Sequence, residues 1–266
     1  MGNSSTVERK TLTLEILVRI QVPQPNFFIS ISTHTRSRIY NRMIYISPPF
    51  GNYISLQDTT RIRGTFTYYR RPGLVYHTLR SLRPIRGGWR NQIGFRNKGI
   101  HAVDFTELTD VYSICGLNEY EWNAMLFHIP KHTKLELNLS CPNVPTISIS
   151  DDAMQAYCNR FPDLIAKVRY DIPNTEIDKL VDMGVKTIHC SNTIPTPKGG
   201  ISGRQLKEVN LPNIERISKR VKRVIAGGGI YTFTDMKDYE QAGAKDFSIS
   251  TILISKPWNV SGLLRT

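Results

Sequence analysis

From residue 41 onward, short apolar runs alternate with segments of helical periodicity, and this alternation constrains the fold more than any other feature of the chain. Such alternation is typical of βαβ units built on a parallel sheet. Eight strands with helices between them predict an α/β fold, the closed (β/α)8 or TIM barrel, which typically takes ~250 residues. The predicted strands are 43–47, 60–66, 111–115, 135–139, 165–168, 186–190, 223–226 and 246–250.

Capping residues predict where two of the helices begin and end. Asn174 or Thr175 is expected to cap a helix that Gly184 ends. Thr234 is expected to open another, which Gly243 ends. Side-chain oxygens at helix starts and glycine at helix ends support these assignments.

The first 40 residues lack the barrel pattern. Residues 11–21 mostly alternate and predict a strand, and residues 22–40 form a connector. We therefore expect an N-terminal extension at 1–40 and one barrel domain at 41–266. Met1 and Gly2 with Thr6 match the short N-myristoylation pattern, but a flexible leader rich in Ser and Asn is the favoured interpretation.

Composition excludes several classes of protein. The chain is 40% hydrophobic and 21% charged, as in ordinary globular domains. No run approaches the ~18 consecutive apolar residues of a membrane span, and the N-terminus lacks a secretory pattern. The cysteines show no metal-binding spacing, which argues against zinc and favours a reducing, cytoplasmic compartment. They are Cys115, Cys141, Cys158 and Cys190.

The chain carries a net charge of +13, and many of its basic residues lie in segment 61–98 with aromatic residues between them. A field of this sign attracts anionic ligands, and nucleic acid is the alternative partner. We interpret segment 61–98 as loop and helix, with no single recognition helix. Nucleic acid is therefore not expected as a partner, and any binding of it should be weak and lost with salt.

Polar or glycine-rich segments directly follow four predicted strands, at the end where barrel enzymes place their sites. Asn138 should point away from Leu137 and Leu139, into the barrel, where its amide needs either a ligand or a loop as partner. The last two segments suit a phosphate site made from backbone N–H groups. The four segments are 136–143, 191–203, 226–230 and 248–251.

Four motifs, in the same order along the chain, resemble the class 1, cytosolic dihydroorotate dehydrogenase family. They are NQIGFRNKGI at 91–100, ELNLSCPNVP at 136–145, SNTIPTPKGGISG at 191–203 and VIAGGGI at 224–230, within a similarity that covers roughly residues 43–256. The resemblance implies a cytoplasmic FMN-dependent oxidoreductase that converts dihydroorotate to orotate in pyrimidine biosynthesis and forms a homodimer. The electron acceptor is left open between fumarate and NAD acting through a partner subunit.

The resemblance also implies roles for individual residues. Cys141 matches the general base that removes a proton from C5 of dihydroorotate while hydride leaves C6. The residues that match substrate contacts are Asn91, Gly94, Asn138, Asn143, Asn192 and Thr193. The residues that match flavin or phosphate contacts are Gly51, Thr65, Lys167, Gly200, Gly228, Gly229, Ser250 and Thr251.

The chain departs from the family pattern at two positions of the predicted site. Gly64 stands where the family carries a lysine that touches flavin and substrate, and Ser250 replaces a usual glycine. Arg63 is adjacent, but neighbours on a strand point to opposite faces, so it cannot substitute. Two alternatives therefore stay open: a dihydrouridine synthase-like, tRNA-modifying flavoenzyme, and a degenerate flavin-binding barrel without turnover.

The role of Cys141 gives the first prediction. Cys141→Ala should preserve flavin binding but slow flavin reduction by a factor on the order of 10²–10⁴, the usual contribution of a positioned base. Cys141→Ser should keep some activity and move its pH optimum upward, because a hydroxyl is a weaker acid than a thiol. Anaerobic stopped-flow bleaching of the flavin against pH measures both. An alanine variant that bleaches at the wild-type rate would remove Cys141 from the mechanism.

Overall fold

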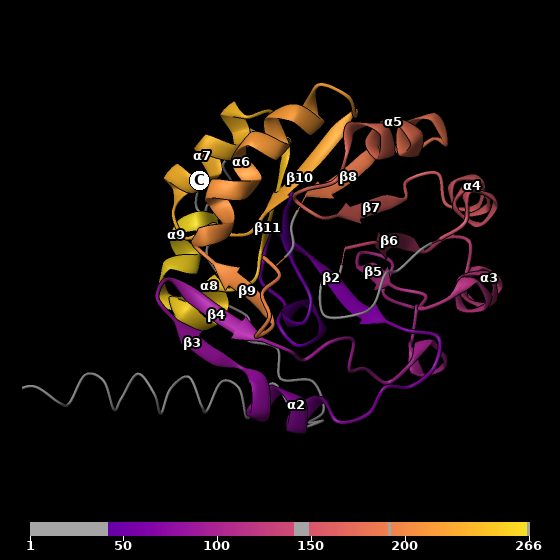
Figure 1. The fold of residues 1–266 in the computed structure, drawn as a ribbon, viewed down its shortest axis with the longest axis horizontal. Coiled ribbons are helices and arrows are strands. Elements are labelled where there is room, and N and C mark those ends of the chain that lie inside the picture. The colour runs from indigo at the N-terminus through magenta and orange to yellow at the C-terminus, as the bar shows by residue number, and fades with distance from the viewer. Residues whose placement is uncertain (1–41, 141–148, 191–192, 265–266) are drawn as a thin grey trace, which may run out of the picture.

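The computed structural model describes residues 42–140, 149–190 and 193–264, and in them eight parallel strands close into a barrel (Figure 1). The barrel confirms the predicted fold class, and each predicted strand is found with its ends displaced by at most one residue. The predicted strand at 11–21 and the boundary at residue 40 lie outside the described residues. Around the barrel the strands are β1 (Ile44–Ile46), β11 (Asp246–Ile249), β10 (Arg223–Gly227), β8 (Thr187–Cys190), β7 (Ile165–Val168), β6 (Lys134–Asn138), β5 (Val111–Ile114) and β2 (Thr59–Phe66).

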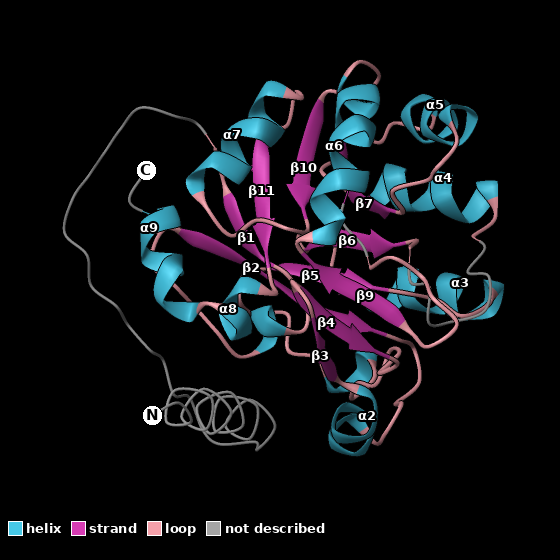
Figure 2. Ribbon diagram, turned by 60° about the vertical axis from the view of Figure 1, so that its left-hand side comes forward, coloured by secondary structure: helices cyan, strands magenta, loops and turns pink. Residues whose placement is uncertain are grey.

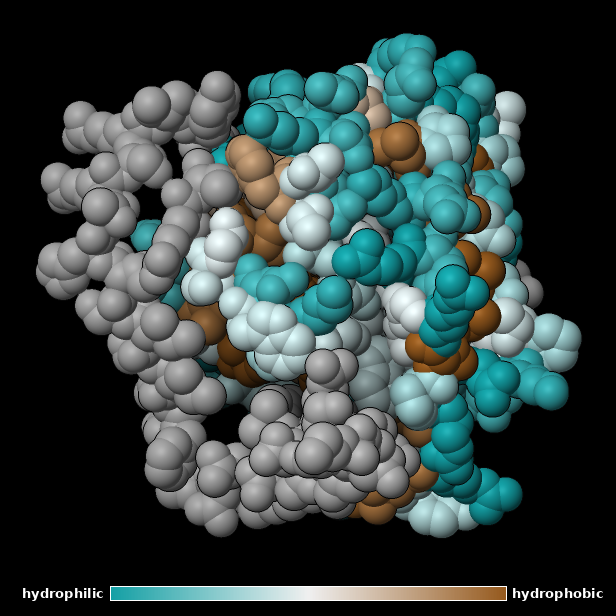
Figure 3. All heavy atoms as spheres, turned by 90° about the vertical axis from the view of Figure 1, so that its left-hand side faces the viewer, coloured by the Kyte–Doolittle hydropathy of each residue, from teal (hydrophilic) through white to brown (hydrophobic). Residues whose placement is uncertain are grey.

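Helices pack around the outside of the barrel, as Figures 1 and 2 show. Those connecting successive barrel strands are α3 (Glu119–His128), α4 (Asp151–Arg160), α5 (Asn174–Asp182), α6 (Gln205–Ser218) and α7 (Phe233–Gln241). The remaining helical segments are η1 (Phe50–Asn52), α2 (Leu74–Ser81), η2 (Ile100–Ala102), α8 (Ile252–Ser255), η3 (Pro257–Asn259) and α9 (Val260–Leu264). On the face shown in Figure 3, the described surface is largely hydrophilic with separate, small hydrophobic areas.

The barrel interior has an apolar lower layer and a polar upper layer. Five side chains from alternate strand positions form an apolar cluster of their own: Tyr45, Ile62, Val111, Ile165 and Ile225. Further along the strands, the inward-facing residues are polar and buried: Ser47, Ser113, Glu136, Asn138, Lys167, His189 and Ser248. Intervening residues such as Leu135 and Leu137 belong to the larger core under the helices. The polar layer lies toward the carboxyl ends of the strands.

A second, antiparallel sheet lies on the carboxyl-end side of the barrel and corrects our interpretation of segment 61–98 as loop and helix. It consists of β3 (Arg83–Ile85), β4 (Gly88–Asn91) and β9 (Gly200–Gly203). Gly88 allows β4 and β9 to approach closely, because a Cβ atom there would lie 1.9 Å from the carbonyl oxygen of Ser202. The indole N–H of Trp89 donates to the hydroxyl of Ser255 at 2.9 Å, which joins the sheet to α8.

The structure corrects both predicted helix caps and confirms both glycine ends. Helix α5 starts at Asn174 after Pro173, and no side chain caps it. Helix α7 is capped by Thr232 rather than Thr234, in a capping box with Asp235. The helices end before Gly184 and Gly243, which have φ angles of 103° and 99°, respectively, values that favour glycine.

The capping box predicts a measurable contribution of Thr232 to stability. Thr232→Ala should lower the free energy of unfolding by about 1 kcal/mol, because the N–H of Asp235 loses its side-chain acceptor. Thr232→Ser keeps that acceptor and should stay close to wild type. Urea unfolding of the full chain measures both, and equal stability of the alanine and serine variants would contradict the assignment.

Candidate active site

A cavity opens in the polar upper layer, at the carboxyl ends of the parallel strands. It brings together six residues predicted to contact ligands: Lys167, Thr193, Gly228, Gly229, Ser250 and Thr251. Its other lining residues are Ser47, Pro48, Ser202, Leu206, Ile230, Tyr231, Ser248 and Ile249. No role was expected for Ser47 or Tyr231 from the sequence. Ser47 follows the end of β1, and Tyr231 follows the glycine turn after β10.

The glycine turn after β10 is shaped by its packing on two helices. Gly228 and Gly229 have φ angles of 84° and 74°. A Cβ atom on Gly228 would lie 2.9 Å from the Cβ of Leu206, and one on Gly229 would lie 2.9 Å from the backbone N of Lys207. Both clashes are with the start of α6, so a bulky residue at Gly228 would disturb this packing rather than fill the cavity.

Side chains from α6 and α7 hold the carbonyl groups of the same turn. The amide of Asn210 donates to the carbonyl of Gly227 and the hydroxyl of Tyr239 donates to that of Gly228, both at 2.7 Å. Among the described residues, no group accepts a hydrogen bond from the N–H of Gly229. Turns of this conformation present N–H groups to anions, so the turn can hold a phosphate.

Asn138 points into the barrel as predicted, and protein groups satisfy part of its amide. Its Nδ2 donates to Oγ1 of Thr65 at 2.9 Å, and its Oδ1 accepts from the hydroxyl of Ser140 at 2.8 Å. The hydroxyl of Thr65 lies 3.1 Å from that of Ser113. No described residue accepts from the second N–H of the amide, so Asn138 can both order the end of β6 and contact a substrate.

Lys167 is the buried cation of the cavity. Its side chain comes from β7, between Asn138 on β6 and His189 on β8 in the strand register, and the residue is 7% exposed. Its ammonium group makes no hydrogen bond or ion pair with any residue that the structure describes. A buried ammonium group needs acceptors. A flavin ring or a phosphate in the cavity would provide them.

Below Lys167, Glu136 and His189 form a fully buried pair. Oε2 of Glu136 lies 2.6 Å from Nδ1 of His189, and its Oε1 accepts from the hydroxyl of Ser113 at 2.7 Å. Burial opposes ionisation of Glu136, but His189, Lys167 and Ser113 outweigh it and hold its pKa below the usual value. Burial lowers the pKa of His189, so the pair is a carboxylate accepting a hydrogen bond from a neutral imidazole.

Gly64 is more than a position where a lysine was lost, because its backbone excludes any side chain. Its φ angle is 118°, and a Cβ atom there would lie 2.2 Å from the carbonyl oxygen of Ser113. The amide of Asn52 holds both the N–H and the carbonyl of Gly64 at 2.8 Å. Arg63 lies against Tyr112 and 3.7 Å from Asp110, so it does not replace a lysine in the cavity, as expected.

Of the remaining predicted residues that the structure describes, Gly51, Asn91, Gly94 and Gly200 do not line the cavity. Gly51 packs against the barrel, where a Cβ atom would lie 2.2 Å from the carbonyl oxygen of Ile62. Asn91 and Gly200 face each other across the antiparallel sheet, and Gly94 follows it in open space, where a Cβ atom would meet nothing within 4 Å. Cys141, Asn143 and Asn192 lie outside the described residues.

The other three cysteines behave as structural thiols. Cys115 and Cys190 are buried and Cys158 is partly buried, and none of the three forms a disulfide with another described residue. Burial raises the pKa of Cys190 to about 12 and also raises that of Cys158, so neither forms a thiolate readily. No cluster of metal-binding side chains occurs among the described residues, and no helix among them is long and apolar enough to cross a membrane.

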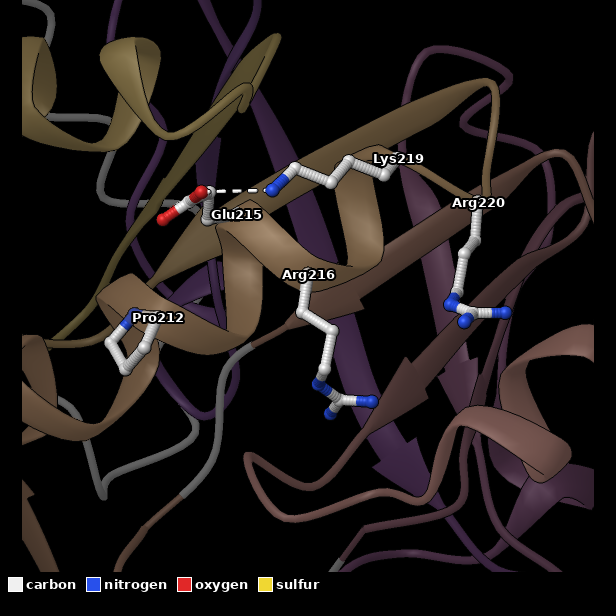
Figure 4. Close-up of a pocket in the computed structure, with 5 residues that line it drawn as sticks. All are labelled: Pro212, Glu215, Arg216, Lys219 and Arg220. Atoms are coloured by element: carbon white, nitrogen blue, oxygen red, sulfur yellow. Dashed lines mark hydrogen bonds and ion pairs between the residues drawn. The ribbon is translucent and has the colours of Figure 1, made fainter.

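A second cavity lies on the outer side of α6, where Figure 4 shows Lys219 reaching toward Glu215. Its cations already have protein partners. Lys219 lies 2.9 Å from Glu215, Arg220 lies 2.6 Å from Asp178, and Arg216 donates to the carbonyl of Ile172 at 2.7 Å. We therefore do not assign an anion site to this surface.

The backbone at Gly64 generates a prediction about restoring the family lysine. Gly64→Lys should lower the free energy of unfolding by roughly 2–4 kcal/mol, because the side chain is strained at this φ and crowds Ser113. Gly262→Lys is the matched control, since a Cβ atom there meets nothing within 4 Å. Urea unfolding compares the two. A Gly64→Lys protein as stable as the Gly262→Lys protein would show that β2 can adapt.

Comparison with known proteins finds relatives of this barrel. The dihydroorotate dehydrogenase family model matches residues 163–263. The catalytic subunit of dihydroorotate dehydrogenase B (NAD(+)) from Geotalea uraniireducens is 29% identical over 203 residues, 62% of this chain and 66% of that protein. Dihydroorotate dehydrogenase A (fumarate) from Lactiplantibacillus plantarum is 24% identical over 209 residues, 64% of this chain and 68% of that protein. The chain thus spans about two thirds of the length of these relatives.

Solved structures share the fold at lower sequence identity. The ligand-free DHODH from Eimeria tenella aligns with a TM-score of 0.65 over 97% of this chain and 92% of that chain, at 16% identity. The complex of DHODH from the same organism with ferulenol aligns with a TM-score of 0.58 over 78% of this chain and 74% of that chain, at 18% identity. The family model over residues 163–263 and the relatives of the same name show that this chain is similar to dihydroorotate dehydrogenases.

Proposed function

We propose that this barrel binds FMN in its upper cavity and oxidises dihydroorotate to orotate. The observation that carries the proposal is the buried ammonium group of Lys167, which has no acceptor among the described residues and faces the same cavity as the glycine turn. The similarity to dihydroorotate dehydrogenases supports dihydroorotate as the substrate.

The residues that line the cavity fit the two chemical parts of FMN. The turn at Gly228 and Gly229 suits the phosphate, with the hydroxyls of Ser250 and Thr251 as further donors. Lys167 suits the ring, because a cation beside it favours the negative charge of the reduced form. When bound, FMN would supply the hydride acceptor, which no side chain can provide.

This chain's own residues would supply orientation and proton transfer. Asn138 keeps one N–H available for a ligand at the end of β6, and Thr193 lines the cavity after β8. Cys141 is proposed as the base that removes the C5 proton, on the family motif alone. The homodimer, the cytoplasmic location and the remaining contacts, including Asn143 and Asn192, likewise rest on the resemblance.

One observation favours a second candidate, a flavin-binding barrel without turnover. The backbone at Gly64 excludes the side chain that the family places there. Such a barrel would keep Lys167 and the glycine turn and so would still bind FMN. Both candidates predict bound FMN. Only the enzyme predicts that dihydroorotate reduces this FMN.

The proposed function predicts the behaviour of the flavin spectrum. The purified protein should bind FMN in a 1:1 ratio and bleach when dihydroorotate is added without oxygen. Absence of flavin binding would contradict the proposal. Binding without bleaching would favour the barrel without turnover, and selective RNA binding at physiological salt would then favour the tRNA-modifying alternative.

Lys167→Met should weaken FMN binding roughly 10- to 100-fold, because a charge-assisted hydrogen bond is worth about 1.5–3 kcal/mol. Lys186→Met is the matched control, since Lys186 is exposed at the opposite end of the neighbouring strand. Fluorescence titration of the FMN-free protein measures both affinities. An equal loss of FMN affinity in the Lys167→Met and Lys186→Met variants would contradict the role of Lys167.

A further inference from the structure

The buried group formed by Ser113, Glu136 and His189 has no part in the function proposed so far. Its three side chains come from β5, β6 and β8 and are fully buried in the polar layer of the barrel. Glu136 accepts at 2.7 Å from Ser113 and lies 2.6 Å from Nδ1 of His189. An ion pair or carboxylate at this depth is not needed to close a barrel, and apolar side chains of similar volume fill the layer below.

The hydrogen bonds of the group fix its charge. A neutral His189 donates from Nδ1 to Glu136, and its Nε2 has no partner among the described residues. Ser113 and His189 therefore orient the carboxylate but do not neutralise it. The charged or titratable groups coupled to Glu136 are His189, Lys167 and, from β1, Tyr45. Lys167 is the only one of these three that carries a positive charge at neutral pH.

The ammonium group of Lys167 needs a negative charge nearby, as the carboxylate of Glu136 needs a positive one. Lys167 is the one lysine that lines the cavity among the described residues, and it has no acid in ion-pair contact. The strand register places Lys167 between β6 and β8, the two strands that carry Glu136 and His189. Burying either charge alone is costly, and burying both in one layer offsets much of that cost.

We propose that Glu136, held in place by Ser113 and His189, is the counter-ion of Lys167 and thereby limits how strongly the cavity prefers reduced over oxidised flavin. This inference rests on the proposed binding of FMN. Glu136 and His189 act through Lys167 and are positioning residues. The negative charge that they hold opposes the negative charge of the reduced ring, while the ammonium group favours it.

The first test replaces the charge and keeps the shape. Glu136→Gln should raise the ratio of affinities for reduced and oxidised FMN about 10-fold, which raises the midpoint potential of a two-electron couple by about 30 mV. Asp246→Asn is the matched control, because Asp246 is an equally buried carboxylate but pairs with Arg223 at the other end of the barrel. It should change stability and leave the potential unchanged.

His189 provides a further check on the positioning role. His189→Gln retains an N–H donor for Glu136 and should keep the midpoint potential of the wild-type protein. His189→Leu removes the donor and should change the midpoint potential. A potential that is the same in wild type, Glu136→Gln and His189→Leu would overturn the inference, since a merely structural group would change only stability.

The second test needs no flavin. In the FMN-free protein, the pKa of Glu136 is expected below its usual value, and Lys167→Met should raise it, because one cause of the low pKa is removed. Titration of the Glu136 carboxyl carbon by ¹³C NMR measures this. Lys186→Met should have no effect.

The two tests separate the inference from the proposed function. If the wild-type protein does not bind FMN, the proposed function fails, and the NMR titration still decides whether Glu136 and Lys167 are coupled. If FMN binds and Lys167→Met leaves the titration of Glu136 unchanged, the counter-ion assignment fails alone. If Glu136→Gln does not fold, the NMR titration of Glu136 in the wild-type and Lys167→Met proteins still tests the counter-ion assignment.

Discussion

The polar half of the barrel interior depends on one buried carboxylate, that of Glu136. It accepts from Ser113 on β5 and pairs with His189 on β8, while Lys167 projects from β7 between them. One side chain on β6 thus links β5 and β8 at the level where the cavity opens. Removing a partner from a buried ionic group leaves a charge uncompensated, which costs about 3–5 kcal/mol. The lower layer, by contrast, is an apolar cluster without a buried carboxylate of its own.

The barrel could be predicted because most of its strands are buried on both faces and are therefore short apolar runs with clear ends, whereas β2 carries Arg61 and Arg63 and is only partly buried. The antiparallel sheet could not be predicted in the same way. It pairs β4 with β9, over 100 residues later, and its short strands carry arginine, tryptophan and glycine without alternation. Local ambiguity explains the wrong caps. Thr232 and Thr234 are both suitable residues, and only the reciprocal bond with Asp235 distinguishes them.

The cavity was predictable to the extent that its residues follow parallel strands, since all such positions meet at one end of a barrel. Lys167, Gly228 and Thr251 meet there. The pair formed by Glu136 and His189 was not predictable, because a single histidine within a strand usually belongs to the core. Only the closed barrel shows that this histidine faces inward and reaches past β7 to a carboxylate. For Gly64 the sequence indicated a missing lysine, whereas the structure shows a backbone that excludes one.

Gly64 and Glu136 together define the charge of the cavity. The family places a lysine at the position of Gly64, and here the lining among the described residues offers one lysine, Lys167, with one buried carboxylate beneath it. The described polar layer is therefore close to neutral, and the support that it gives to a negative ring is smaller than that of a site with two cations. Because the backbone at Gly64 cannot take a side chain, this balance can be changed more readily at Glu136 than by adding a second cation. If FMN binds as proposed, the polar layer below the cavity, rather than the missing lysine alone, would set how easily the flavin is reduced.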